Sequence, residues 1–565
     1  MGHPQPLDIG IEVPIDNNNA VLPRHDFTAV RMRLSNVIAM DLWTRKGILN
    51  TFASITAISL VLFFTFPRAM LTTDFKSLSS TTDPIVPANC SKETPSRDFD
   101  PRVELLLKYW QELYLGNGTS SSSSSIKSAP RAPHLQNCSQ QTSAWDTVDA
   151  SGNRPNWIFP TARESHNPRA PNEDVVFRGG PQPPWIEGGD DDNLPMTRQA
   201  QTDLWLHQHP KDCTDKSTKF LVNDWVNSPK LGLGGQMVAM AGIFAIAVNE
   251  KRVLVTDTLN RADHDECKGS ARAHWSCYFV LETSEECRAQ AKRLLSQKKA
   301  WKQKVVTNAN SYPKAYMWFG KVPEKWGRPW ETMQPLDVVG GEILGGHKAT
   351  DRQWWRAQAL RYLMRAPSEY LCKQLNLARH HRFGRQAAEL TIKTLPTNWP
   401  GSEQQHQQAS LREKIWTTPK PWLPRPMLSV HVRQGDKASE MKIFSFKSYM
   451  ELAQKIQTQF PQLQEIWLST EMQNVIDESK NYTNWKFHYT DIPRQNGTTS
   501  MGAYERSLGV KASSNNAFVN FVMASECDFF VGALGSTWSF LIDAMRATGG
   551  KLRAGFLSVN KDRYW

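Results

Sequence analysis

Five ionisable side chains follow an apolar strand and form the most chemically informative stretch of the sequence. In SVHVRQGDKASEM, residues 429–441, these are His431, Arg433, Asp436, Lys437 and Glu440. Burying such groups without partners is costly. The run therefore lies either on a solvated loop with local ion pairs or at a site for an anionic ligand. An arginine fork matches two phosphate oxygens, Lys437 adds a compact positive charge, and Glu440 is the carboxylate placed to act as a base.

A C-terminal α/β unit is expected to position these residues. Ligands of open α/β sheets bind at the carboxyl ends of the strands. The strand ends that should face one crevice are Arg433 onward, Ser469-Thr470-Glu471 and LGSTWS (534–539). Ser536 would begin the last helix, whose N-terminal amides favour a phosphate, although an ordinary helix cap is the alternative. The predicted strands are 427–432, 465–470 and 528–533, and the predicted helices are about 446–458, 515–525 and 537–547.

A βαβ unit precedes this region in the chain. Strand 219–224 leads through the loop GLGGQ (232–236) into an apolar helix, 237–248, and a second strand, 252–257. The loop is not a dinucleotide fingerprint, because Met237 stands where that pattern needs a glycine. It still lets backbone amides approach an anion closely, and a tight turn is an equally good interpretation.

One apolar segment predicts in which cellular compartment the protein lies. Residues 47–66, GILNTFASITAISLVLFFTF, are twenty residues without a charge, which is the length of a membrane-spanning helix. Arg45 and Lys46 precede the segment, and a basic excess on that side predicts a cytosolic tail, 1–46. The expected protein is a single-pass type II membrane protein with a signal anchor, and its long C-terminal part is lumenal.

Glycosylation sequons and cysteines support a lumenal location. All eight cysteines follow residue 66, and an oxidising lumen permits disulfides. The Asn-x-Ser/Thr sequons after the membrane segment are Asn89, Asn117, Asn137, Asn481 and Asn496. Residues 67–205 are rich in serine and proline and are predicted to be a mostly disordered stem. A short helix within it, 103–115, would either pair with a second chain, giving a homodimer, or dock on the protein surface.

The charge and the cysteine spacing narrow the classes of ligand. The net charge of +12 and pI near 9.2 favour an anionic partner. No zinc-finger, homeodomain or RRM signature is present, so nucleic acid is not expected as a partner. No cysteine or histidine cluster has zinc spacing, so no metal site is expected.

Several motifs resemble those of the α-1,6-fucosyltransferases, the family of core-fucosylating and bacterial nodulation enzymes. HVRQGDK with Glu440 and Tyr449 is similar to the family's HVRRTDK and its downstream Glu and Tyr, which have the same nine-residue separation. HPKDC (209–213) with GLGGQ resembles the family's PKDC and glycine loop. WWRAQALRYLMRAP resembles WWVSQFVKYLIRP, and DFFVGALGSTWS resembles DFLVCTFSSQ. The resemblance covers roughly residues 209–550.

The resemblance implies an α/β, GT-B-like enzyme that transfers fucose from GDP-fucose to a glycan or glycoprotein acceptor in the Golgi, with inversion and without a metal or other cofactor. The implied domains are an N-terminal α/β subdomain, 206–395, and a Rossmann-like GDP-fucose-binding subdomain, 396–565. Glu440 would be the catalytic base, tuned by Lys437, and Arg433 would hold the diphosphate. Glu471 would contact the acceptor. The remaining donor-site residues would be His431, Asp436, Tyr449, Asn520, Ser536, Gly234, Gly235 and Gln236.

Departures from the family pattern leave other functions open. The family's second arginine is Gln434, its second acidic residue after the strand is Met472, and its guanine-side Asp is Asn520. A protein O-fucosyltransferase or a cell-wall polysaccharide fucosyltransferase is the alternative enzyme. A catalytically inactive Golgi glycan-binding or scaffold protein is the alternative of a different class.

The resemblance also implies disulfide pairs. HWSCYFVLETSEEC resembles the family segment whose closing cysteine pairs with that of PKDC, so Cys213–Cys287 is expected, with Cys267–Cys277 nested inside it. Cys372 and Cys527 are expected to be buried free thiols. The stem cysteines Cys90 and Cys138 are expected to pair with each other or across a dimer.

Overall fold

The computed structural model describes residues 100–114, 130–139, 183, 185–226, 231–319, 321–333, 337–339, 342–343, 350–400 and 420–560. All of them belong to one compact unit, Pro95–Trp565. The predicted tail, the membrane segment 47–66, Cys90, Asn89 and Asn117 lie outside the described residues. Within the described ranges, no helix is both long and apolar enough to cross a membrane.

A small parallel sheet carries the glycine loop. Strand β1 (Lys219–Asn223) lies between β2 (Arg252–Thr256) and β3 (Val306–Thr307), with parallel pairing on both sides. Helix α5 (Leu233–Asn249) connects β1 to β2. This helix is apolar over nearly its whole length and buried on most sides, as expected for a helix inside a core rather than on a surface. The predicted βαβ unit is therefore present, although its helix begins at Leu233 and not at residue 237, so Gly234, Gly235 and Gln236 belong to the first turn of the helix.

A larger sheet carries the ionisable run. Its strand order is β5-β4-β10-β9-β6-β7-β8, and all its pairs are parallel except β4 with β5. The interior strand β6 (Met427–His431) is buried throughout, which suits a parallel strand covered on both faces. The other bounds are β4 (Asp337–Val339), β5 (Glu342–Ile343), β7 (Glu465–Ser469), β8 (Lys486–His488), β9 (Phe529–Gly532) and β10 (Phe556–Ser558).

The second sheet begins earlier in the chain than the predicted subdomain boundary at 395/396. Strands β4 and β5 fall within the predicted first subdomain, yet β4 pairs with β10 near the end of the chain. Strands this short have no recognisable periodicity, and only the long-range pairing reveals them. Two parallel α/β sheets otherwise agree with the predicted α/β class and fit a GT-B-like architecture.

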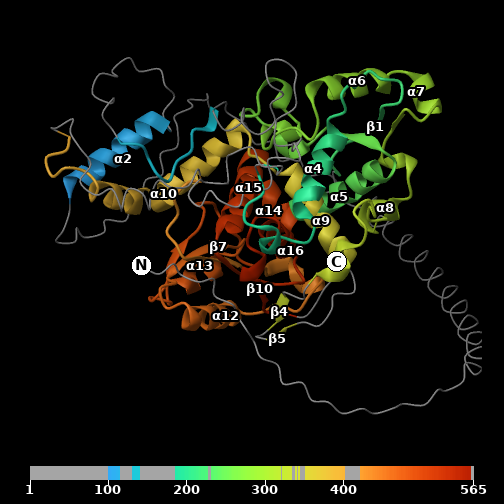
Figure 1. Cartoon of the computed structure of the whole chain (residues 1–565). Helices are drawn as coiled ribbons and strands as arrows, with labels where there is room; N and C mark the ends of the chain where they lie inside the picture. Colours follow the sequence, from blue (N-terminus) through green and yellow to red (C-terminus); the bar gives the residue numbers. More distant parts are fainter. Residues whose placement is uncertain are drawn as a thin grey trace, which may run out of the picture. The chain divides into compact units, whose positions relative to one another are not determined.

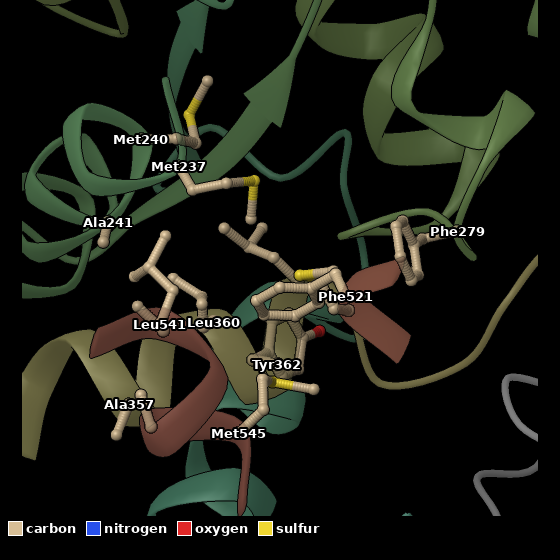
Figure 2. Close-up of a cluster of buried hydrophobic side chains, with 14 of the residues drawn as sticks. Met237, Met240, Ala241, Phe279, Ala357, Leu360, Tyr362, Phe521, Leu541 and Met545 are labelled. Carbon is tan, nitrogen blue, oxygen red and sulfur yellow. The ribbon is translucent and has the colours of Figure 1, made fainter. Parts of the chain in front are cut away.

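A continuous hydrophobic core joins the helices that pack between the two sheets. Helix α9 (Thr350–Leu363) contacts both α5 and α16 (Thr537–Ala547), and α15 (Val510–Glu526) contacts α16. Figure 2 shows side chains from these helices meeting: Met237, Met240 and Ala241 of α5, Leu360 and Tyr362 of α9, Phe521 of α15, and Leu541 and Met545 of α16. The glycine loop at the start of α5 is thereby held against the elements of the larger sheet.

Parts of the predicted stem are folded onto this core, which corrects the expectation of disorder for those segments. Helix α2 (Pro101–Tyr114) lies beside α10 (Glu369–Ile392), far away in the sequence (Figure 1). Helix α4 (Thr197–Gln208) packs on α9. The physical reason is the apolar face of the predicted helix 103–115: Val103, Leu106 and Trp110 are buried against α10, which agrees with the docking alternative.

The disulfides confirm two predicted pairs and correct another prediction. Cys213–Cys287 and Cys267–Cys277 are bonded, with Cα–Cα distances of 4.9 and 5.4 Å. The third disulfide is Cys138–Cys372, with a Cα–Cα distance of 5.6 Å. The predictions of a free Cys372 and of a stem-only pair for Cys138 were therefore wrong, because residues 130–139 dock on α10. Cys527 is a buried free thiol, as predicted.

Candidate functional site

A pocket of about 260 Å³ lies where the two α/β units meet. Its walls come from the glycine loop, the ends of β6 and β7, the start of α16 and the helices α14 (Met501–Leu508) and α15. The carboxyl ends of the parallel strands thus share one crevice, as the sequence predicted. The predicted site residues that line it are Gly234, Gly235, His431, Arg433, Asp436, Lys437, Glu440, Glu471, Asn520 and Ser536.

Two helix N-termini face this pocket. Helix α5 begins after Gly232 and α16 begins after Ser536. They touch each other: a Cβ atom on Gly234 would lie 3.4 Å from Trp538 and 3.5 Å from Thr537. The Ser536 side chain does not cap its own helix, so the ordinary-cap alternative does not describe it. Two helix N-termini with their positive dipole ends in one pocket make a favourable place for an anion.

Arg433 is buried and engaged by two carboxylates. Its Nη2 donates to Asp436 Oδ1 at 2.5 Å, and its Nη1 donates to Glu471 Oε1 and to the Gln434 carbonyl. Burial acts to lower the pKa of Arg433, but the two carboxylates outweigh it and raise that pKa above its usual value. Asp436 Oδ2 also accepts from the Met501 amide at 3.0 Å, which ties the end of β6 to the start of α14. The guanidinium is therefore fully charged but already occupied by protein partners.

The predicted base and its neighbour form a second ion pair. Lys437 Nζ donates to Glu440 Oε2. The lysine side chain is 10% exposed, whereas the glutamate side chain is 50% exposed. A carboxylate that is open to the pocket and held by an adjacent ammonium can accept a proton from a bound hydroxyl group. With Arg433 and its partners, these groups place two cations beside three carboxylates.

The other end of the pocket is lined by neutral polar groups. His431 Nδ1 lies 2.7 Å from Ser539 Oγ. Burial, with a smaller effect of Arg433, lowers the pKa of His431 to about 3, so the imidazole is neutral at physiological pH. Asn520 accepts from Ser469 Oγ at 3.2 Å and donates to Thr490 Oγ1 and to Asn516. The side-chain amide of Asn520 is therefore hydrogen-bonded to other protein groups.

Two predicted donor-site residues lie behind the pocket wall. Gln236 donates to the Val226 carbonyl at 2.7 Å and accepts from Arg261 Nε at 2.6 Å, so it braces the glycine loop. Tyr449 lies on α12 (Phe446–Gln459) and is completely buried. Neither residue lines the pocket, which corrects the expectation of direct ligand contact.

Sequence reasoning missed the contribution of α14. Met501, Tyr504, Glu505 and Leu508 line the pocket, and Glu505 forms an ion pair of 2.7 Å with Arg261. No strand precedes this helix directly, so its sequence carries no strand-end signal. A helix brought in from a long connection becomes part of the site only through tertiary packing.

The other predicted positions lie away from the pocket. The sequon residues Asn137, Asn481 and Asn496 are exposed. His264, Cys267 and Cys277 come close enough together to hold a metal ion, a cluster that sequence spacing did not reveal. However, the two cysteines are joined in a disulfide, so their thiolates are not available as ligands.

Comparisons with known proteins do not establish a family for this chain. No protein-family model matches it, and no curated protein matches it. Among solved structures, the apo form of POFUT1 is 12% identical, with a TM-score of 0.25, over 59% of this chain and 96% of that one. A mutant of Arabidopsis thaliana FUT1 in complex with GDP is 11% identical, with a TM-score of 0.22, over 62% of this chain and 73% of that one. Likenesses at these scores carry no argument about substrate or mechanism.

Proposed function

We propose that this chain is an inverting, GDP-fucose-dependent fucosyltransferase that acts on a glycan or glycoprotein acceptor. The main support for this proposal is that one pocket combines the N-termini of α5 and α16, the Arg433 guanidinium and the Lys437–Glu440 pair. An anion site and a partly exposed carboxylate lie within the same crevice. That combination matches a donor with a diphosphate leaving group and an acceptor that must lose a proton.

The proposed reaction is a single displacement at the anomeric carbon of the sugar. Glu440 takes the proton of an acceptor hydroxyl group as that oxygen attacks, and the bond to the diphosphate breaks with its electron pair on the leaving GDP. The helix amides and Arg433 stabilise the negative charge that develops there. This assigns to protein groups the role that a metal ion plays in other transferases, and we propose that no metal cofactor is needed.

We further propose an α-1,6-fucosyltransferase-like specificity and a single-pass type II location in the Golgi membrane, with the pocket in the lumen. The motifs HVRQGDK and HPKDC and the exposed sequons Asn137, Asn481 and Asn496 support this proposal. A protein O-fucosyltransferase or a polysaccharide fucosyltransferase would use the same donor chemistry with a different acceptor.

A catalytically inactive binding protein is the second candidate, and a specific observation favours it. Asp436 and Glu471 both hold the Arg433 guanidinium, so in this state their negative charge opposes the binding of a diphosphate. An enzyme needs a way to release it, whereas a glycan-binding protein does not.

The test uses the full-length protein in detergent with GDP-fucose, GDP-mannose and UDP-glucose, against N-glycan, peptide and polysaccharide acceptors. We expect acceptor-dependent release of GDP from GDP-fucose, in the presence of a chelator as well. Tight binding of acceptor glycans without turnover of any donor would instead identify the inactive binding protein.

A further inference from the structure

Three buried polar atoms without partners belong to two residues near the Arg433–Glu471 ion pair. They are Tyr449 Oη and both side-chain amide atoms of Gln495, none of which has a hydrogen-bond partner among the described residues. Buried polar groups are nearly always paired, and an unpaired one is destabilising. A cluster of such groups next to a charged pair indicates that their partner is present in another state of the site.

The position of Gln495 places it beside Glu471. The backbone N–H of Gln495 donates to the backbone carbonyl of Glu471 at 2.9 Å, so the two backbones are directly linked. Gly435 has a left-handed conformation, with φ +61°. A Cβ atom built on it would lie 3.5 Å from Gln495 Nε2 and 3.6 Å from Glu471 Oε1. Both atoms therefore border the same side of Gly435, and Gln495 Nε2 is a donor within reach of a shifted carboxylate.

The phenol of Tyr449 approaches the same pair from α12. Burial raises the pKa of Tyr449, and the backbone amide of Arg433 and the charges of Glu471 and Arg433 also act on it. The Arg433 amide approaches the phenol oxygen without completing a hydrogen bond. The O–H proton of Tyr449 thus has no acceptor while Glu471 is held by Arg433.

A diphosphate that binds Arg433 would compete with the carboxylates that hold the guanidinium. Two cations and three carboxylates occupy this part of the pocket, and the excess negative charge would repel a phosphate. Once Arg433 turns to the ligand, the backbone N–H of Gln434, at 3.2 Å, is the one hydrogen-bond donor that the described residues still offer to the buried Glu471 carboxylate. An uncompensated buried charge is strongly unfavourable, so other donors must replace the guanidinium.

We propose that Tyr449 and Gln495 are positioning residues that donate hydrogen bonds to the Glu471 carboxylate when Arg433 binds a diphosphate. In the free protein, Arg433 holds Glu471 and the two neutral donors are unpaired. In the bound state, Tyr449 Oη–H and Gln495 Nε2–H donate to Glu471, while the guanidinium donates to phosphate oxygens. The inference rests on the proposed function, and it also explains how an Arg433 held by two carboxylates becomes available to the ligand.

The test compares ligand affinity with stability of the free protein. Tyr449→Phe and Gln495→Met keep the side-chain volume nearly unchanged but remove the proposed donors. Each should weaken the binding of GDP, measured by calorimetry, by about tenfold to hundredfold, the effect of one lost hydrogen bond to a charged group. Each should leave the Tm of the free protein unchanged or raise it, because the removed group has no partner there. A purely structural role would lower that Tm.

A matched control and a double mutant complete the experiment. Ser429 Oγ on β6 is also buried and unpaired, but it does not line the pocket, so Ser429→Ala should not change the affinity. In a Glu471→Gln background, Tyr449→Phe should weaken binding by less than twofold, because no carboxylate remains to accept the hydrogen bond.

Running the titrations with GDP and UDP separates the two proposals. Binding of UDP but not GDP would overturn the proposed donor. The change of hydrogen-bond partners at Glu471, here called the exchange, would still be measured with UDP. Equal affinity of wild type and both variants for whichever diphosphate binds would overturn the exchange alone. Absence of binding by either nucleotide would overturn both proposals.

Discussion

The Arg433 guanidinium and the Glu471 carboxylate form a buried ion pair between the ends of the neighbouring strands β6 and β7. The two residues are 38 positions apart in the chain, and the parallel pairing of the two strands brings them together. Arg433 is therefore held in place before any ligand arrives.

Removing the guanidinium should greatly slow transfer. We expect Arg433→Ala to lose about 2–4 kcal/mol of transition-state stabilisation, the range for one lost preorganised donor. The measurement is kcat/KM with GDP-fucose together with GDP affinity. Arg433→Lys is the matched control, since it keeps the charge but not the fork and should retain part of the binding. Wild-type GDP affinity and turnover in Arg433→Ala would remove Arg433 from the donor site.

Glu440 is predicted to act on the proton rather than on the donor. Glu440→Gln keeps the shape of the side chain but cannot accept a proton, so kcat should fall by about 10²–10⁴-fold, the usual contribution of a general base. Donor affinity should change little. The control is Glu451→Gln, an exposed glutamate on α12, which should behave as wild type. A loss in kcat below about tenfold for Glu440→Gln would assign the proton to another group.

The Cys138–Cys372 bond should stabilise the docking of the stem segment on α10. We expect Cys138→Ser to lower the free energy of unfolding by about 2–5 kcal/mol, as for other native disulfides, measured by denaturant unfolding. Cys527→Ser, at a buried thiol without a disulfide partner, should lower it by less, on the order of 1 kcal/mol. Peptide mapping without reduction should recover Cys138 linked to Cys372. Recovery of Cys138 linked to Cys90 would contradict the observed pairing.

The buried imidazole of His431 should make stability depend on pH. Its pKa is lowered to about 3 in the folded protein, whereas an unfolded histidine titrates near about 6.5. Between these values the unfolded chain binds the extra proton, so stability rises with pH up to about 6.5 and is lost as the pH falls towards 3. We expect His431→Asn, which can still pair with Ser539, to reduce the slope of unfolding free energy between pH 6.5 and 4. An unchanged slope would show that other groups control this range.

Local sequence chemistry determined much of the site. The strand that ends at His431 and the run from Arg433 to Glu440 were recognisable because apolar residues give way to charges where a parallel strand ends. The glycine loop was recognisable in the same way, from a short motif. The signal for both features lies within a few residues of the feature that it predicts. The pairs Cys213–Cys287 and Cys267–Cys277 were instead predicted from the resemblance to a known family.

Only the tertiary structure decided which of these groups meet and in what state. It paired Arg433 with Glu471, placed Tyr449 and Gln236 behind the pocket wall, and brought Met501 and Tyr504 of α14 to the pocket. It also joined Cys138 to Cys372 across 234 positions. The sequence determines which side chains can carry charge or donate a proton, because that is a property of each residue. Their pairing depends on distances between segments remote in the chain, which arise only when the sheets and helices pack around a common core.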